Sequence, residues 1–236
     1  MIELHYWPTP NGQKIAMLLE ELAEQGHALE YTIKPVDIGA GDQLKPDFLM
    51  ISPNNKMPAI VDHAPADGGA PISVFESGAI LLYLAEKAGR LISADKRERV
   101  ATLEWLFWQV GGLGPMHGQH GHFNVYAPQP VPYAIDRYGR ETTRLLGVLD
   151  KRLADRAYIV GDAYGIADIA CYPWIMAYDK APLDLSMLPN LRRWHATIAA
   201  RPSTQRALAL KHHVNPAAGQ PLSDAGRKHL FGYGAE

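Results

Sequence analysis

Cysteine is almost absent from this sequence: its 236 residues include one, Cys171. A single cysteine excludes an intramolecular disulfide and a Cys-x-x-Cys dithiol motif, and it is typical of proteins from a reducing compartment. An excess of charge is missing as well, since the formal net charge is -2 at pH 7. Without a basic footprint, a nucleic-acid partner is not expected.

Long apolar runs are also missing. No stretch reaches the ~18 apolar residues of a membrane span, and the first residues, Met1 to His5, lack the basic and apolar regions of a signal peptide. We therefore expect a cytoplasmic protein with no membrane partner. The hydrophobic content of 47% is that of an ordinary globular chain, long enough for one large or two small cores.

Strand and helix patterns follow one another in the first 88 residues. Apolar residues alternate with polar ones in the strands and recur every three or four positions in the helices. The expected elements are a strand at 2–6, a helix from about 10 to about 25, strands at 29–33, 59–62 and 72–75, and a helix from Ser77. This order predicts an α/β thioredoxin-like domain over residues 1–88.

From Asp95 onward the patterns are helical. A linker at 89–94 is expected to lead into an all-α domain at 95–212, with a Gly-, Pro- and Ala-rich tail at 213–236 that we expect to be poorly ordered. The helices are expected from about 96 to 110, through 135–153, from 165, from about 189 to 200, and weakly after 202. Leu103, Leu106, Phe107 and Val110 should share one face of the first, and Trp105 and Trp108 are expected in the core.

A loop is expected between this helix and about Pro132. His117, His120 and His122 lie in it with tolerable spacing for a metal, but no carboxylate or thiol joins them, so we expect no metal site. Exposure, or a place beside a second substrate, is the better interpretation of these histidines.

Two short motifs point to a binding site. In the first, Met57-Pro58 precedes a strand, where a cis peptide is plausible and where Met57 would present its main-chain N–H and C=O to an extended peptide. In the second, Glu76-Ser77 marks a helix start, where a carboxylate would meet free N–H groups. Each motif alone is also typical of ordinary turns and helix starts. Together they suggest a cradle for a short, acidic peptide.

Three polar residues lie near the start of the first helix. Thr9 and Asn11 bracket Pro10, where helix-end N–H groups favour a thiolate, although plain capping explains them as well. Tyr6 could also donate a hydrogen bond, but its alternation with Ile2 and Leu4 favours a core position.

The sequence resembles the nu-class bacterial glutathione transferases, relatives of the yeast nitrogen-regulation prion protein. The segments that carry the resemblance are Pro8 to Gly12, Ser52 to Asp62, Phe75 to Ile80 and Trp105 to Met116, and the similarity extends from Met1 to about Leu210. One departure is Gly165, which stands where the family has a Ser or Thr helix cap, in front of Asp168. The cost of a Gly cap is only a few tenths of a kcal/mol.

The resemblance implies roles for specific residues. Thr9 and Asn11 would contact the glutathione sulfur, whose thiol has an ordinary pKa of ~8.5 that the site must lower. The binding residues implied for glutathione are Gln43, Lys56, Met57 with Pro58, Glu76, Ser77 and, from the helical domain, Arg137. The implied cofactor is glutathione as co-substrate, with no metal, and the implied assembly is a homodimer.

The activity implied by the resemblance is reduction of small disulfides by glutathione. Two glutathiones would be used and oxidised glutathione formed, while Cys171 is expected to be a buried apolar group outside the chemistry. Two alternatives stay open: a transferase that conjugates electrophiles, with weak peroxidase activity, and a non-catalytic glutathione-binding regulatory module.

Overall fold

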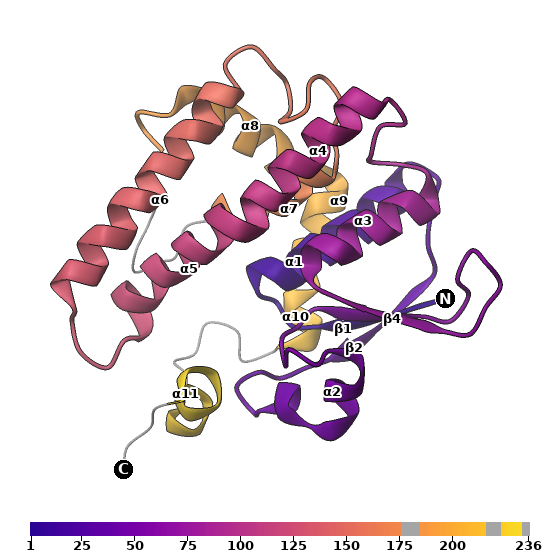
Figure 1. The fold of residues 1–236 in the computed structure, drawn as a ribbon, viewed down its shortest axis with the longest axis horizontal. Helices are drawn as coiled ribbons and strands as arrows, with labels where there is room; N and C mark the ends of the chain where they lie inside the picture. Colours follow the sequence, from indigo (N-terminus) through magenta and orange to yellow (C-terminus); the bar gives the residue numbers. More distant parts are fainter. Residues whose placement is uncertain (176–184, 216–222, 233–236) are drawn as a thin grey trace. The chain divides into compact units, whose positions relative to one another are not determined.

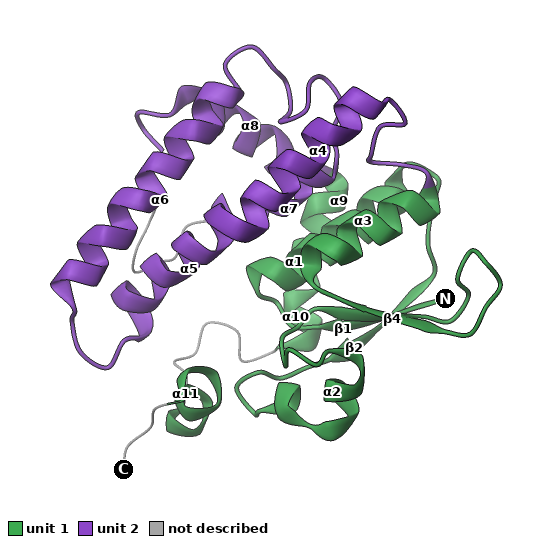
Figure 2. Ribbon diagram, in the orientation of Figure 1, with its two compact units in different colours: residues 1–88, 202–236 green, residues 89–201 purple. Residues whose placement is uncertain are grey.

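The computed structural model describes residues 1–175, 185–215 and 223–232 (Figure 1). The chain divides into two compact units (Figure 2). Unit 1 comprises residues 1–88 and 202–236, and unit 2 comprises residues 89–201. In the described part of the chain, no helix is both long and apolar enough to span a bilayer.

Unit 1 is built on a four-stranded sheet with the order β2-β1-β3-β4. β1 is parallel to β2 and antiparallel to β3, and β3 is antiparallel to β4. The strands are β1 (Ile2–Tyr6), β2 (Tyr31–Pro35), β3 (Ala59–Asp62) and β4 (Ile72–Phe75). The predicted βαβ-ββα order of a thioredoxin-like domain is confirmed, although β2 begins two residues later than expected.

The helices of unit 1 pack against this sheet and against each other. Those before residue 89 are α1 (Pro10–Glu24), the 3-10 turn η1 (Asp42–Leu44), α2 (Pro46–Ile51) and α3 (Ser77–Ala88). Those after residue 201 are α9 (Pro202–Ala209), α10 (Lys211–Val214) and α11 (Asp224–Phe231).

The place of α9 differs from the expected division, which assigned residues 95–212 to the helical domain. α9 packs along α1, with Ser203 donating to the buried Glu21 carboxylate. Arg206 donates to Glu20 at 2.8 Å and to Glu24 at 2.7 Å. These contacts join α9 to unit 1, because the small buried residues of α9 fit against α1 and Arg206 pairs with the acidic side chains of α1.

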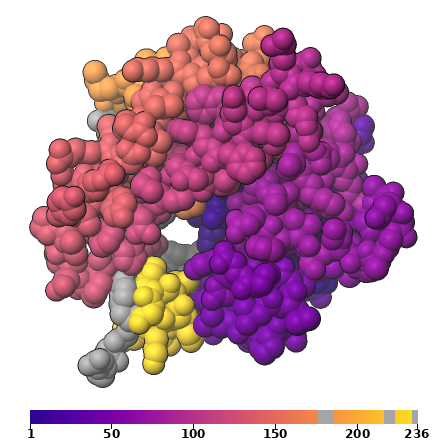
Figure 3. All heavy atoms as spheres, in the orientation of Figure 1, coloured from indigo at the N-terminus to yellow at the C-terminus, as the bar shows by residue number. Residues whose placement is uncertain are grey.

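The C-terminal tail contains more structure than expected. The ring Nδ1 of His229 on α11 lies 3.0 Å from the carbonyl oxygen of Gly39, and the ring covers Gly41. In the space-filling view, yellow atoms of α11 adjoin purple atoms of unit 1 (Figure 3). The expectation of poor order also covered residues 216–222 and 233–236, which lie outside the described residues.

Unit 2 is helical, as predicted. Its elements are α4 (Lys96–Trp108), the π-helical turn η2 (Gln109–Leu113), α5 (Gly114–Gly121), the π-helical turn η3 (His122–Tyr126), α6 (Pro132–Arg152), α7 (Ile166–Ile175) and α8 (Pro189–Ala199).

One expectation for the segment after α4 is wrong. Residues 111–126 are helical rather than a loop: α5 lies between the π-helical turns η2 and η3, the backbone of Leu113 is already helical, and α5 packs on α6 and α7. Phe107 is 67% exposed and not part of the buried face that Leu106 occupies. Trp105 and Trp108 are partly buried and form an edge-to-face pair with 5.0 Å between ring centroids.

Candidate active site

The N-terminus of α1 holds Thr9 and Asn11 as expected. Thr9 is the N-cap residue: its Oγ1 accepts a hydrogen bond from the Gly12 N–H at 3.2 Å, and Pro10 follows as the first helical residue. Asn11 is partly buried in the first turn. The first-turn N–H groups and the helix dipole make this end of α1 favourable for negative charge. Capping therefore occupies one lone pair of the Thr9 hydroxyl and leaves its proton to donate elsewhere.

The second part of the site is the turn before β3. The Met57-Pro58 peptide is cis, as predicted. No hydrogen bond within the described residues engages the main-chain N–H or C=O of Met57, whereas the carbonyl of the exposed Lys56 accepts from Ser52 Oγ at 2.7 Å. The Met57 sulfur accepts from the Thr9 hydroxyl at 3.3 Å. Residues 48 positions apart are thereby brought together, as a common site for a cysteinyl ligand requires.

The third part is the start of α3. Glu76 is exposed and has a left-handed backbone, with φ +70, and its carboxylate accepts from Asn54 Nδ2 at 3.4 Å. Ser77 is the first residue of α3, and its Oγ accepts from Lys14 Nζ at 3.1 Å. Because a cation fills the acceptor side of the hydroxyl, the Ser77 proton is free to donate to a ligand oxygen.

Lys14 was not among the predicted site residues. It is buried in α1, at 1% exposure, and reaches the first turn of α3. A carboxylate bound at that turn would meet this charge in addition to the helix dipole. The signal that could have revealed Lys14 is its position on the helix: Met17 and Leu18, three and four residues later, are buried on the same face.

Gln43 and Arg137 complete the set predicted from sequence. Gln43 is buried in η1, where its Nε2 donates to the Ile38 carbonyl at 3.2 Å and its Oε1 has no hydrogen-bond partner among the described residues. Ile38, whose carbonyl accepts from Gln43, packs on the apolar cluster that contains Met57. Arg137 is exposed on α6 in unit 2, and its role stays a prediction.

Two residues are confirmed as core groups. Tyr6 is fully buried in β1, and burial raises the pKa of its phenol to about 12. Cys171 is buried in α7 and forms no disulfide. A phenol held inside the sheet and a thiol inside a helix of unit 2 are poor candidates for activating a ligand thiol at the mouth of α1.

The histidines of unit 2 occupy helical positions rather than a loop. His117 is fully buried on α5 with its ring centroid 6.0 Å from that of Trp174, and burial lowers the pKa of His117 to about 4. His120 and His122 are partly buried. Among the described residues, no three His, Cys, Asp or Glu side chains are grouped as a metal site would require.

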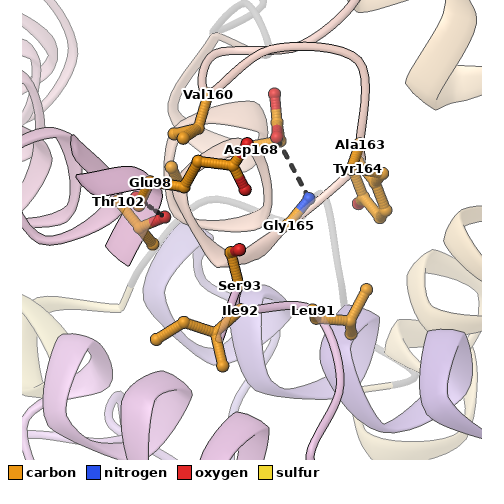
Figure 4. A pocket seen from close by; sticks show the side chains of 11 residues that line it. Leu91, Ile92, Ser93, Glu98, Thr102, Val160, Ala163, Tyr164, Gly165 and Asp168 are labelled. Carbon is orange, nitrogen blue, oxygen red and sulfur yellow. Dashed lines mark hydrogen bonds between the residues drawn. The ribbon is translucent and has the colours of Figure 1, made fainter. Parts of the chain in front are cut away.

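A separate cavity of about 200 Å³ lies within unit 2 at the start of α7 (Figure 4). Its one fully buried carboxylate, Asp168, accepts from the N–H groups of Ile159 at 2.9 Å and Gly165 at 3.1 Å, and from Trp194 Nε1 at 2.7 Å. Asp168 thus reaches back to the helix start, as the sequence pattern predicts. A side chain on Gly165 would place its Cβ 2.9 Å from the Leu91 carbonyl oxygen, which accounts for the glycine.

The geometry of unit 1 agrees with comparisons to known proteins. Residues 2–86 match the glutathione S-transferase N-terminal domain, and residues 127–202 match the glutathione S-transferase C-terminal domain. The disulfide-bond oxidoreductase YfcG of Escherichia coli K12 is 59% identical over 208 residues, which cover 88% of this chain and 94% of that protein. The chain belongs to the glutathione S-transferase family.

Solved structures of other family members share the fold of this glutathione S-transferase. A family member from Pseudomonas fluorescens, solved with two glutathione bound, is 41% identical with a TM-score of 0.80, covering 88% of this chain and 92% of its own. A glutathione transferase from Pseudomonas putida, with one glutathione disulfide bound per subunit, is 41% identical with a TM-score of 0.81, covering 88% of this chain and 90% of its own.

Proposed function

We propose that this glutathione S-transferase reduces small disulfides with glutathione. The observation that carries the proposal is the meeting of the Thr9 hydroxyl, at the N-terminus of α1, with Met57, whose main-chain N–H and C=O are unengaged within the described residues. A thiol and a peptide unit of one ligand can be held by these neighbouring groups. The relative named a disulfide-bond oxidoreductase supports this choice of reaction.

Each part of glutathione has a matching group in unit 1. The cysteinyl main chain pairs with Met57, as a strand pairs with a sheet edge. The γ-glutamyl carboxylate accepts hydrogen bonds from the Ser77 hydroxyl and from the first N–H groups of α3. The ammonium group forms an ion pair with the Glu76 carboxylate. Gln43 Oε1, buried without a partner, accepts a ligand N–H. Lys56, exposed beside Met57, is the proposed cation for the glycyl carboxylate.

Thr9 and Asn11 activate the thiol. A hydroxyl that donates to sulfur, together with the helix N-terminus, favours the thiolate and lowers the pKa of the glutathione thiol from its ordinary ~8.5. The thiolate attacks one sulfur of the substrate disulfide. A mixed disulfide forms, and the other substrate sulfur leaves as thiolate and takes up a proton from solvent.

A second glutathione completes the reaction. Its thiolate attacks the glutathione sulfur of the mixed disulfide, which forms oxidised glutathione and releases the second substrate thiol, so that two glutathiones supply two electrons. Arg137 is the proposed partner for a carboxylate of this second molecule. The solved relatives with two glutathione or one glutathione disulfide bound support a site of that size.

One experiment separates the candidate activities. Rates with a hydroxyethyl-disulfide-type substrate and with a chlorodinitrobenzene-type electrophile are measured side by side at equal glutathione. Faster disulfide reduction is the expected result. Faster conjugation would favour the transferase alternative, and glutathione binding with neither activity would favour a regulatory module.

The remaining proposals concern class and assembly. We assign the chain to the nu class on the motif resemblance, and to the cytoplasm on its single cysteine. For a two-fold homodimer, the supporting observation is that Val100 and Phe107, seven residues apart on one face of α4, are 57% and 67% exposed. Sedimentation at micromolar concentration should give twice the 26.0 kDa of one chain, and Phe107→Glu should lower the dimer fraction. A wild-type protein that sediments only as a monomer contradicts this assembly.

A further inference from the structure

The single proton of the Thr9 hydroxyl is already donated within the protein. Its oxygen accepts the Gly12 N–H at 3.2 Å, and its single proton is donated to the Met57 sulfur at 3.3 Å. If the Thr9 proton is to be donated to a glutathione sulfur, the hydrogen bond from Thr9 to the Met57 sulfur must break. The side chain of Met57, and not only its main chain, then takes part in binding the thiol.

The Met57 thioether also occupies the mouth of α1. A Cβ placed on Gly12 would lie 2.8 Å from Met57 Cε and 2.1 Å from the Trp7 carbonyl oxygen. The methyl end of Met57 consequently rests on the first turn, beside the N–H groups that attract a thiolate. Met57 is 8% exposed and packs with Val36, Phe48 and Ala59.

We infer that the Met57 thioether is a competing acceptor that holds the Thr9 proton in the ligand-free protein and gives way to the glutathione sulfur. This inference rests on the proposed function. A thioether is a weak, neutral acceptor, whereas a thiolate is a charged one that forms a stronger hydrogen bond, so the exchange favours the ligand. The flexible methionine side chain can turn aside without moving the backbone.

The first test observes the exchange directly. In protein labelled at the methionine methyl carbons, the Met57 resonance is identified by its loss in Met57→Leu. Saturating glutathione should shift this resonance, whereas a glutathione analogue with alanine in place of cysteine should shift it much less, because that analogue has no sulfur to claim the Thr9 proton. Equal shifts with both ligands overturn the inference.

The second test measures the coupling between the two side chains. Met57→Leu keeps the apolar volume but removes the competing acceptor, so glutathione should bind roughly two- to fivefold more tightly, with a lower pKa of the bound thiol by thiolate absorbance. In a Thr9→Val background the same change should have no effect on either quantity. Met57→Ile serves as a second variant if Met57→Leu folds poorly.

The outcomes separate this inference from the proposed function. If the wild type does not bind glutathione by calorimetry, the proposed function fails and the inference fails with it. If the wild type binds glutathione but Met57→Leu changes neither the affinity nor the pKa of the bound thiol, the inference alone is overturned. An equal effect of Met57→Leu with and without the Thr9 hydroxyl also overturns it, since the effect would then be one of packing.

Discussion

Glu76 allows stability and binding to be separated by a pair of substitutions. Its backbone is left-handed, with φ +70, a conformation that costs a non-glycine residue roughly 1–2 kcal/mol. Glu76→Gly relieves this cost. It also increases the conformational entropy of the unfolded chain, which cancels roughly 0.5–1 kcal/mol of the stability gained. The free energy of unfolding should therefore equal that of the wild type or exceed it by up to about 1.5 kcal/mol. Glu76→Gln keeps the strained backbone and should leave stability unchanged, since the contact with Asn54 is exposed and long.

Both variants should bind glutathione more weakly. A hydrogen bond to a charged group contributes ~1.5–3 kcal/mol, so loss of the contact with the ligand ammonium should raise Kd about tenfold or more. Urea unfolding gives the stability and calorimetry gives the affinity. Asn55→Gly is the backbone control, because Asn55 also has positive φ, at 47, but is a residue type that tolerates it.

The opposite pattern would exclude Glu76 from a ligand-binding role. A Glu76→Gly protein that is destabilised by more than about 1 kcal/mol would mean that the side chain supports the fold rather than a ligand. Unchanged glutathione affinity in Glu76→Gln would remove Glu76 from the site even if the stability result is as expected.

Three further predictions concern other parts of the molecule. Ser77→Ala should raise the Kd for glutathione about tenfold. It should also lower the free energy of unfolding by ~1–3 kcal/mol, because the hydroxyl accepts from a buried lysine. Ser73→Ala, at an exposed position, is the control, and equal glutathione affinity in Ser77→Ala and the wild type would contradict the role of Ser77. Cys171→Ser should keep nearly full glutathione-dependent disulfide reductase activity while Asn11→Ala lowers it, and the reverse result in folded proteins would rule out the proposed chemistry. Burial lowers the pKa of His117 from 6.5 to about 4, so the unfolded chain binds the extra proton between these values. The free energy of unfolding should therefore fall by up to about 3 kcal/mol as pH falls through this window; His117→Gln should lack this slope, and an identical slope in both proteins would refute the burial argument.

Sequence patterns predicted those features that depend on neighbouring residues. Alternation and helical periodicity placed the four strands and most helices, and the Thr9-Pro10 pair placed the start of α1. The Met57-Pro58 and Glu76-Ser77 motifs marked two turns of the candidate site. Such signals are local, because main-chain geometry, caps and turn residues act over a few positions.

The segment from residue 111 to 126 shows where local signals fail. Its glycines and prolines favour a loop, yet it is helical in the structure, because packing on α6 and α7 outweighs weak helix propensity. The exposure of Phe107 has a related cause: helical periodicity identifies an apolar face, but it does not say which part of that face a neighbouring helix covers.

The contacts within the site were decided by tertiary structure alone. Lys14 and Ser77 are 63 positions apart and Thr9 and Met57 are 48 apart, yet each pair shares a hydrogen bond. The sequence by itself determined that a helix start, a proline turn and a second helix start exist in unit 1. Only the pairing of β1 with β3 and the packing of α1 against α3 brought their polar groups together, since a hydrogen bond requires two atoms within about 3 Å and no local pattern specifies that distance.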